Sequence, residues 1–158
     1  MYLKSAVIGP EGGHAAGRAL LKEMYETHYG AAMPHICLGP HGMPFFKDSP
    51  VHFSISHSKS RVFCVLAENP VGIDAEELDR NIDLRLAKKI LSPGELRQFD
   101  RSADQRKALL TFWVLKEAQA KCTGEGLRGF PNHTDFSLSD PRVWEQEGHL
   151  VALIEGEK

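Results

Sequence analysis

The stretch from Ala103 to Cys122 constrains the fold of this chain more than any other. Six large apolar residues occur within seven consecutive positions and point in nearly every direction around a helix: Leu109, Leu110, Phe112, Trp113, Val114 and Leu115. A helix that is apolar nearly all round has to be buried on most of its sides. The pattern predicts a central helix, opened by a capping box at Ser102-Ala103-Asp104-Gln105, whose middle is covered by the rest of the chain.

Short strands are predicted on the N-terminal side of this helix. Residues 51–57 alternate apolar and polar side chains, which is typical of a half-buried strand. Residues 62–67 form a continuous apolar run, which indicates a buried strand, and a further strand at 71–76 follows the turn at Asn69-Pro70. The other predicted elements are strands at 3–8, 35–38, 135–138 and 149–154, helices at 14–28 and 83–91, a helix opened by the capping box Ser92-Pro93-Gly94-Glu95, and a loop at 39–50.

Length and charge place the chain among ordinary globular proteins. With 158 residues, we expect one domain over 1–158, with an N-terminal half at about 1–68 and a C-terminal half at about 69–158. A formal net charge of −2 gives no overall attraction to nucleic acid or to a membrane surface. No apolar run approaches the roughly 20 residues that span a bilayer. The segment from Met1 to Pro10 is too weakly apolar for a secretory signal. We therefore expect no nucleic acid and no membrane among the partners.

The three cysteines limit the other kinds of site. Cys37, Cys64 and Cys122 lie far apart in the sequence and form no CxxC pair. Their spacing indicates neither a disulfide framework nor a structural zinc site. A reducing, cytoplasmic location is the prediction that follows.

Two acidic residues end the strand predicted at 71–76. Asp74 and Glu76 are two positions apart, so on a strand their side chains point to the same face. Such a pair suits Mg²⁺, which proteins usually hold with one or two carboxylates while substrate phosphates and water complete the octahedron. The alternative is a solvated strand end, because Glu77 and Asp79 continue the acidic run. Spacing alone leaves both interpretations open.

A third carboxylate directly follows the buried part of the long helix. Unpaired charge at Glu117 would cost several kcal/mol by typical estimates. Either Glu117 faces a cleft in which a cation neutralises it, or it forms an ion pair with Lys121 one turn further on. His57 ends a strand between Ser56 and Ser58, in a polar turn that would suit an anion, although a lone histidine there is more often structural.

Three motifs occur in a fixed order, namely FSISHS at 53–58, VGIDAE at 71–76 and WVLKEAQAK at 113–121. Together with LSPGE at 91–95, they resemble the 4′-phosphopantetheinyl transferase superfamily over roughly Gly42 to Leu138. Asp74 lies mid-chain, which resembles the two-repeat (surfactin-synthetase-activating) type, because in single-repeat members this aspartate lies near the N-terminus. The resemblance implies an α+β fold, with two pseudo-symmetric halves of antiparallel strands packed on helices.

The resemblance also implies an activity. Such a holo-[acyl-carrier-protein] synthase moves the 4′-phosphopantetheine arm of coenzyme A to a serine of an apo acyl or peptidyl carrier protein. Adenosine 3′,5′-bisphosphate is released, and the enzyme acts as a monomer in fatty-acid or secondary-metabolite biosynthesis. Asp74, Glu76 and Glu117 would hold Mg²⁺, or Mn²⁺ in its place, against the pyrophosphate of coenzyme A.

The remaining residue roles come from the same resemblance. Glu117 would act as general base for the carrier serine, and Lys121 would bind coenzyme A and stabilise phosphate charge in the transition state. His57, with Ser56 beside it, would bind the 3′-phosphate of coenzyme A. Because the attacking serine belongs to the carrier, no nucleophile is needed in this chain.

Two departures keep other functions open. The loop Gly42-Met43-Pro44 has Met43 at the place of the lysine in the Gly-Lys-Pro sequence that is common in the superfamily. Only four lysines and arginines precede His57: Lys4, Arg18, Lys22 and Lys47. One alternative is a non-catalytic member that only binds carrier protein or coenzyme A, and another is a Mg²⁺-dependent phosphohydrolase. The sequence leaves fatty-acid, polyketide and peptide-synthetase carriers equally open as partners.

Overall fold

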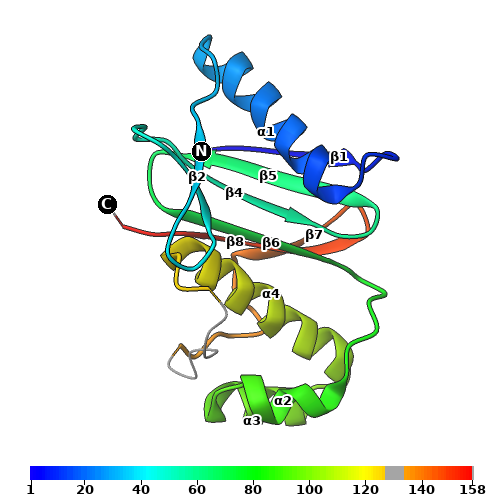
Figure 1. Cartoon of the computed structure of the whole chain (residues 1–158). Helices are drawn as coiled ribbons and strands as arrows, with labels where there is room; N and C mark the ends of the chain where they lie inside the picture. The colour runs from blue at the N-terminus through cyan, green and yellow to red at the C-terminus, as the bar shows by residue number, and fades with distance from the viewer. Residues whose placement is uncertain (127–133, 158) are drawn as a thin grey trace.

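The computed structural model describes residues 1–126 and 134–157, so part of the stretch that carries the resemblance, 127–133, lies outside the described residues. The fold is α+β, as predicted, with antiparallel strands and helices on both sides of them (Figure 1). The elements of the N-terminal half are β1 (Tyr2–Val7), α1 (Gly13–Tyr29), β2 (Ile36–Leu38), β3 (Pro44–Phe46), β4 (His52–His57) and β5 (Arg61–Ala67). Those of the C-terminal half are β6 (Val71–Glu77), the 3₁₀ turn η1 (Leu84–Leu86), α2 (Ala87–Ile90), α3 (Pro93–Arg101), α4 (Gln105–Thr123), β7 (Val143–Gln146) and β8 (His149–Glu155).

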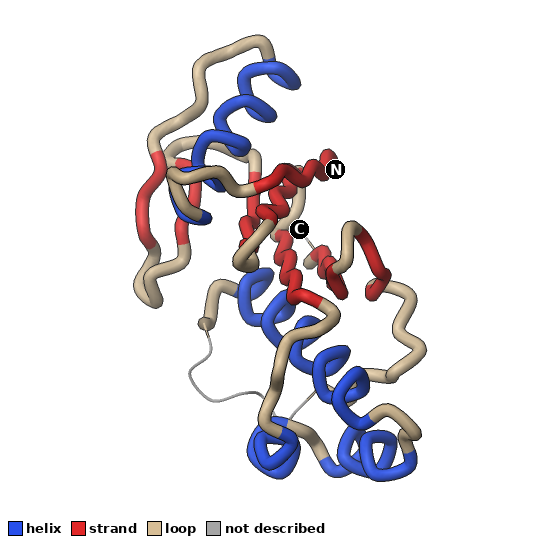
Figure 2. Tube along the Cα trace, turned by 90° about the vertical axis from the view of Figure 1, so that its right-hand side faces the viewer, coloured by secondary structure: helices blue, strands red, loops and turns tan. Residues whose placement is uncertain are grey.

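The strands form two three-stranded antiparallel sheets and one hairpin. The first sheet has the order β1-β5-β4, the second has the order β6-β8-β7, and β2 pairs with β3. Helix α1 lies on one side of these strands and α4 on the other, with α2 and α3 beyond α4 (Figures 1 and 2). Among the described residues, no helix is both long and apolar enough to cross a membrane.

Serine side chains connect the two sheets where β4 lies against β6. The backbone N–H of Ile73 donates to Ser54 Oγ at 3.1 Å, and that of Ala75 donates to Ser56 Oγ at 3.1 Å. Each hydroxyl takes the place of a carbonyl in a regular ladder and satisfies a buried donor. Consequently the motifs at 53–58 and 71–76 are held side by side.

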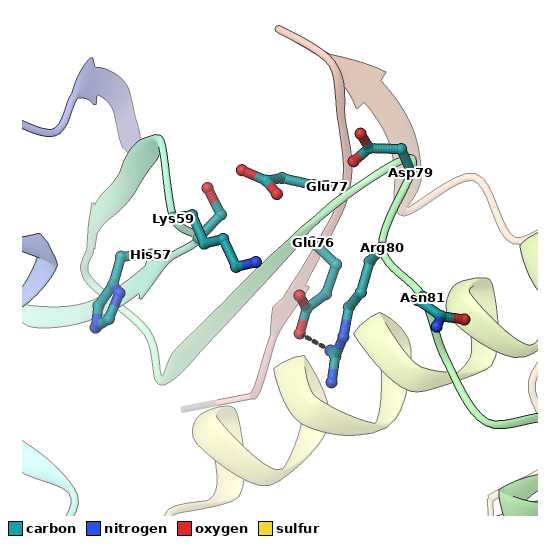
Figure 3. A pocket seen from close by; sticks show the side chains of 8 residues that line it. His57, Lys59, Glu76, Glu77, Asp79, Arg80 and Asn81 are labelled. Carbon is teal, nitrogen blue, oxygen red and sulfur yellow. Dashed lines mark hydrogen bonds and ion pairs between the residues drawn. The ribbon is translucent and has the colours of Figure 1, made fainter.

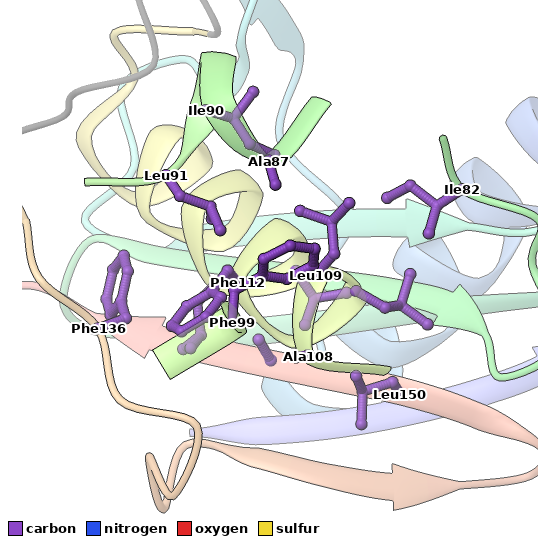
Figure 4. Packing of buried hydrophobic residues seen from close by; sticks show 14 of the residues in the cluster. Ile82, Ala87, Ile90, Leu91, Phe99, Ala108, Leu109, Phe112, Phe136 and Leu150 are labelled. Carbon is purple, nitrogen blue, oxygen red and sulfur yellow. The ribbon is translucent and has the colours of Figure 1, made fainter. Parts of the chain in front are cut away.

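The core has three parts, and the middle one belongs to both halves. It combines three buried residues of β5, three of β6 and one of β8: Phe63, Val65, Ala67, Val71, Ile73, Ala75 and Val151. The N-terminal part packs α1, through Leu21 and Met24, against the first sheet. In the C-terminal part, Leu109 and Phe112 of α4 meet residues of α2, α3 and β8 (Figure 4). The predicted burial of the long helix is therefore confirmed.

Helix α4 approaches β6 more closely than a side chain would allow. A Cβ atom added at Gly72 would lie 1.9 Å from the carbonyl oxygen of Ala118 and 2.5 Å from the backbone nitrogen of Cys122. Backbone atoms cannot move aside as a flexible side chain can, so glycine is required here. This contact sets Glu117 and Lys121 of α4 beside Asp74 of β6.

The prediction of a strand at 135–138 was wrong, because these residues are not part of any strand. The backbone of Phe136 bonds to side chains of α3 instead: its N–H donates to Glu95 Oε1 at 3.0 Å, and its carbonyl accepts from Gln98 Nε2 at 3.0 Å. On the side away from β6, the strand that pairs with β8 is β7, which the sequence did not indicate. Strand β3 lies within the predicted loop at 39–50. Because extended segments this short carry little periodicity, tertiary pairing decides them.

Two details of the helices also differ from the prediction. Helix α4 is capped by Asp104, which accepts from the N–H of Lys107 at 2.9 Å, so it begins later than the box at Ser102 suggested. The capping box of α3 is confirmed, and its Glu95 is completely buried. Lys116 Nζ lies 2.9 Å from Glu95 Oε2 and forms an ion pair with it, but the angle does not meet that of a hydrogen bond. Both side chains are buried. Lys116 thus belongs to the core of the C-terminal half.

Candidate active site

Asp74 is the buried centre of the candidate site. Its Oδ1 accepts hydrogen bonds from Lys121 Nζ at 2.8 Å and from Ser56 Oγ at 3.1 Å. Lys121 also donates to the carbonyl of Ile73 at 3.0 Å, so two of its three donors are engaged. Oδ2 of Asp74 is buried and has no hydrogen-bond partner among the described residues. This carboxylate is held by one oxygen while the other stays available.

Glu76 lies two residues further along β6 and is half-buried. It forms an ion pair with Arg80 (Figure 3). The guanidinium carbon of Arg80 lies 5.2 Å from the centre of the Trp113 ring. Burial raises the pKa of Glu76 above its ordinary value, and the charge of Asp74 adds to that effect. Arg80, a hydrogen bond with Trp113 and Lys121 act in the opposite direction on this pKa.

Glu117 comes from α4, one turn before Lys121, and is also half-buried. Burial raises the pKa of Glu117 to about 7, and the charges of Asp74 and Glu76 contribute to the rise, while Lys121 and Arg80 oppose it. The sequence left open an ion pair between Glu117 and Lys121. In the structure, Lys121 makes its ion pair with Asp74. Three carboxylates from two elements therefore share one electrostatic environment with two cations.

This set of groups fits a divalent cation. Asp74 Oδ2 is buried and has no hydrogen-bond partner among the described residues. Burial, and then the neighbouring carboxylates, raise the pKa values of Glu76 and Glu117, and a bound cation would offset both effects. Carboxylate oxygens are the ligands that Mg²⁺ and Mn²⁺ prefer. Within residues 1–126 and 134–157, no three such groups are already gathered closely enough to hold a metal ion. Ligation by all three would require side-chain movement at Glu76 or Glu117.

His57 and Ser56 have different surroundings although they are neighbours. His57 is exposed and lies against the start of α1, where a Cβ atom added at Gly13 would be 2.4 Å from His57 Nδ1. The first turn of a helix has unpaired N–H groups, and no acidic residue occupies this one, so the position suits an anion. Ser56 is buried, and its hydroxyl is engaged with Asp74 and Ala75.

Two open pockets border the site. The first, of about 710 Å³, includes His57, Lys59, Glu76 and Arg80 in its lining (Figure 3). The second, of about 450 Å³, includes Lys121 together with residues of the β2–β3 hairpin and the end of α4. Glu76 thus faces one pocket and Lys121 the other.

Sequence reasoning missed two residues of the site. Trp113 was expected in the core, but it is only half-buried and its ring supports Arg80. Arg80 was not among the predicted site residues. Its spacing of four residues from Glu76 was the available signal, because an i, i+4 pair can also form across a turn that follows a strand.

Comparison with known proteins agrees with the motifs. The family model of the 4′-phosphopantetheinyl transferase superfamily matches residues 70–155, which include Asp74, Glu76, Glu117 and Lys121. This range is more than half of the chain. The chain belongs to this superfamily. The resemblance stated from the sequence is confirmed, and the α+β fold with antiparallel sheets is consistent with the fold of the family.

Named relatives support this membership. The chain is 32% identical over 116 residues to 4′-phosphopantetheinyl transferase psf-1 of Bacillus pumilus, which covers 70% of this chain and 49% of that protein. It is 34% identical over 89 residues to 4′-phosphopantetheinyl transferase gsp of Aneurinibacillus migulanus, covering 55% of this chain and 37% of the relative. It is 30% identical over 122 residues to 4′-phosphopantetheinyl transferase HetI of Nostoc, which covers 71% of this chain and 52% of the relative. The chain thus spans about half the length of these relatives, or less.

Proposed function

We propose that this chain transfers the 4′-phosphopantetheine arm of coenzyme A to a serine of an apo carrier protein. The observation that carries the proposal is the meeting of Asp74, Glu76 and Glu117 with Lys121, in a chain of this superfamily. In the reaction, the serine oxygen forms a bond to the pantetheine-bearing phosphorus of the pyrophosphate. The P–O bond to the other phosphate breaks, and adenosine 3′,5′-bisphosphate leaves.

Each residue of the site has a role in this proposal. Asp74, Glu76 and Glu117 would hold Mg²⁺ or Mn²⁺, which when bound neutralises charge on the phosphate oxygens. Glu117 takes the proton of the carrier serine, either directly or through a water molecule. Lys121 has one donor left for a phosphate oxygen, and it acts there as a point charge.

The 3′-phosphate of coenzyme A is assigned to His57, beside the start of α1. Ser56 stays a predicted coenzyme ligand, but its single proton is engaged with Asp74, which supports a role in orienting that carboxylate. The other proposals are an acyl or peptidyl carrier as partner, a monomeric state and a cytoplasmic location. The three cysteines are free thiols, which agrees with a reducing location.

Intact-protein mass spectrometry of a panel of apo carrier proteins tests the activity. With coenzyme A and Mg²⁺, we expect one carrier class to gain the mass of one phosphopantetheine. The gain should disappear with EDTA and in Asp74→Ala and Glu117→Ala. Asp100→Ala, at an exposed position of α3, is the matched control and should retain the gain.

The same samples separate the alternatives. Carrier or coenzyme A binding without any mass gain would indicate a non-catalytic member of the superfamily. Release of adenosine 3′,5′-bisphosphate from coenzyme A in the absence of a carrier would indicate a phosphohydrolase. A mass gain that survives EDTA would contradict the metal-dependent mechanism.

A further inference from the structure

We propose that Arg80 is a displaceable counter-ion of Glu76. It neutralises this carboxylate in the metal-free protein, and it turns to a phosphate oxygen of the substrate when Glu76 binds the metal. The inference rests on the proposed function, because it assigns Arg80 a role toward the same metal and the same pyrophosphate. It makes Arg80 a positioning residue before coenzyme A binds and a substrate contact afterwards.

The guanidinium is held on two sides. One nitrogen, Nη1, pairs with Glu76 Oε1, and the guanidinium carbon lies 5.2 Å from the centre of the Trp113 ring. Stacking on an aromatic face stabilises a guanidinium independently of its carboxylate partner. Trp113 lies on α4 one turn before Glu117, so Arg80 is supported by the same helix that carries the third carboxylate. If Glu76 leaves, the Trp113 ring still supports the cation.

The backbone under Arg80 is fixed. The N–H of Leu78 donates to the carbonyl of Gly148 at 3.0 Å, and the N–H of Arg80 donates to that of Glu77 at 2.9 Å. Arg106 Nη1 donates to the carbonyls of Leu78 and Arg80, the second at 3.4 Å. Only the side chain of Arg80 therefore has freedom to move, and 36% of it is exposed.

Asp74 and Glu76 differ in whether pairing with a cation keeps them available to a metal ion. Lys121 and Ser56 share one oxygen of Asp74, and the other oxygen is available. Glu76 is instead paired with Arg80 and also has a hydrogen bond with Trp113, and among the described residues the carboxylates are not yet gathered around a metal position. Ligation by Glu76 thus competes with its bond to Arg80.

The released guanidinium faces a suitable space. Arg80 and Glu76 line the pocket of about 710 Å³ together with His57 and Lys59 (Figure 3). A guanidinium offers several parallel donors, which match the oxygens of a phosphate. Exchanging Glu76 for a phosphate oxygen keeps the cation paired, and a pyrophosphate in this pocket would then contact Arg80 on one side and the metal on the other.

Mn²⁺ binding, followed by the electron paramagnetic resonance signal of the free ion, tests the competition directly. Arg80→Ala should bind Mn²⁺ roughly tenfold more tightly than the wild type, because a positive charge next to the ion and a competitor for Glu76 are both removed. Arg80→Lys keeps the charge and should stay closer to the wild type. Arg85→Ala removes an arginine that is 90% exposed and paired with Asp83, so it is the matched control and should not change the affinity.

Steady-state kinetics give the second measurement. In Arg80→Ala, the KM for coenzyme A should rise about tenfold while metal binding tightens, a combination that loss of structure would not produce. Equal or weaker Mn²⁺ binding by a folded Arg80→Ala protein, with normal binding by the wild type, would overturn the inference and leave the proposed function intact. If neither protein bound Mn²⁺, both proposals would fail together.

Discussion

Two serines of β4 have the same bond to β6 but different relations to the site. Ser54 accepts from the N–H of Ile73 and Ser56 from that of Ala75, each at 3.1 Å, and both side chains are buried. Only Ser56 also donates to Asp74 Oδ1, at 3.1 Å. Both serines therefore join the two sheets, but only Ser56 also orients the Asp74 carboxylate.

Alanine substitutions at these two positions should show that difference. Ser54→Ala and Ser56→Ala should each lower the free energy of unfolding by about 1–3 kcal/mol, because each leaves a buried N–H without its partner. Only Ser56→Ala should also lower kcat for transfer, by about tenfold. Urea denaturation and carrier loading measure the two effects. Equal kinetic losses in both variants would show that Ser56 has no special relation to Asp74.

Glu117 gives the metal-free protein a pH-dependent stability. The pKa of Glu117 is raised from 4.5 to about 7 in the fold, so between these values the unfolded chain loses the proton first. The free energy of unfolding therefore falls through this group as the pH rises from about 4.5 to 7, and the loss stays constant above that range.

The expected result is a more stable variant at high pH. With EDTA present, Glu117→Gln should exceed the wild type by about 1 kcal/mol at pH 8 and equal it at pH 4, after discounting for the half-exposed position of the carboxyl. Thermal denaturation across pH measures this difference. Glu125→Gln, at an exposed position, should follow the wild type. Superimposable profiles for all three proteins would refute the raised pKa.

At the scale of elements, one close contact aligns helix and strand. Helix α4 crosses β6 at Gly72, where a Cβ atom would lie 1.9 Å from the Ala118 carbonyl oxygen. We expect Gly72→Ala to cost about 3 kcal/mol of stability and to reduce transfer strongly, since α4 would have to move away from Asp74. Gly39→Ala is the control, because its Cβ would meet Met43 O at an ordinary 3.5 Å. Retained Mn²⁺ affinity in a folded Gly72→Ala protein would contradict this alignment.

At the scale of the whole molecule, the two halves share a core. Phe63 of β5 is fully buried in the middle cluster and lies edge-on to His149, at 5.3 Å between ring centres. Both tryptophans, Trp113 and Trp144, belong to the C-terminal half, so their fluorescence reports on that half. The shared cluster indicates that the halves unfold together.

Phe63→Ala tests this coupling. It should lower the free energy of unfolding followed by tryptophan fluorescence by about 3–5 kcal/mol, although the substitution lies in the other half. Val7→Ala, at an exposed position of β1, should change little. If Phe63→Ala left the free energy of unfolding measured by tryptophan fluorescence unchanged, the halves would unfold independently.

The sequence by itself determined the family and the α+β class. It also predicted Asp74, Glu76, Glu117 and Lys121 as site residues, whereas Arg80 and Trp113 entered the site only with the structure. Long or continuous apolar segments, such as the predicted helix at 103–122 and the run at 62–67, give strong local signals. Motifs of fixed composition identify the superfamily. Short strands were the weak point, as β3, β7 and the segment around Phe136 show, because a few extended residues have no pattern of their own.

Only the tertiary structure decided how the charges pair. From spacing, Glu117 and Lys121 formed an acceptable helical pair, and Arg80 had no predicted partner. In the folded protein, the ion pairs join Lys121 with Asp74, Arg80 with Glu76 and Lys116 with Glu95. A charge has many partners within reach along a sequence, and burial selects among them, because only the pairs that form can offset the loss of water.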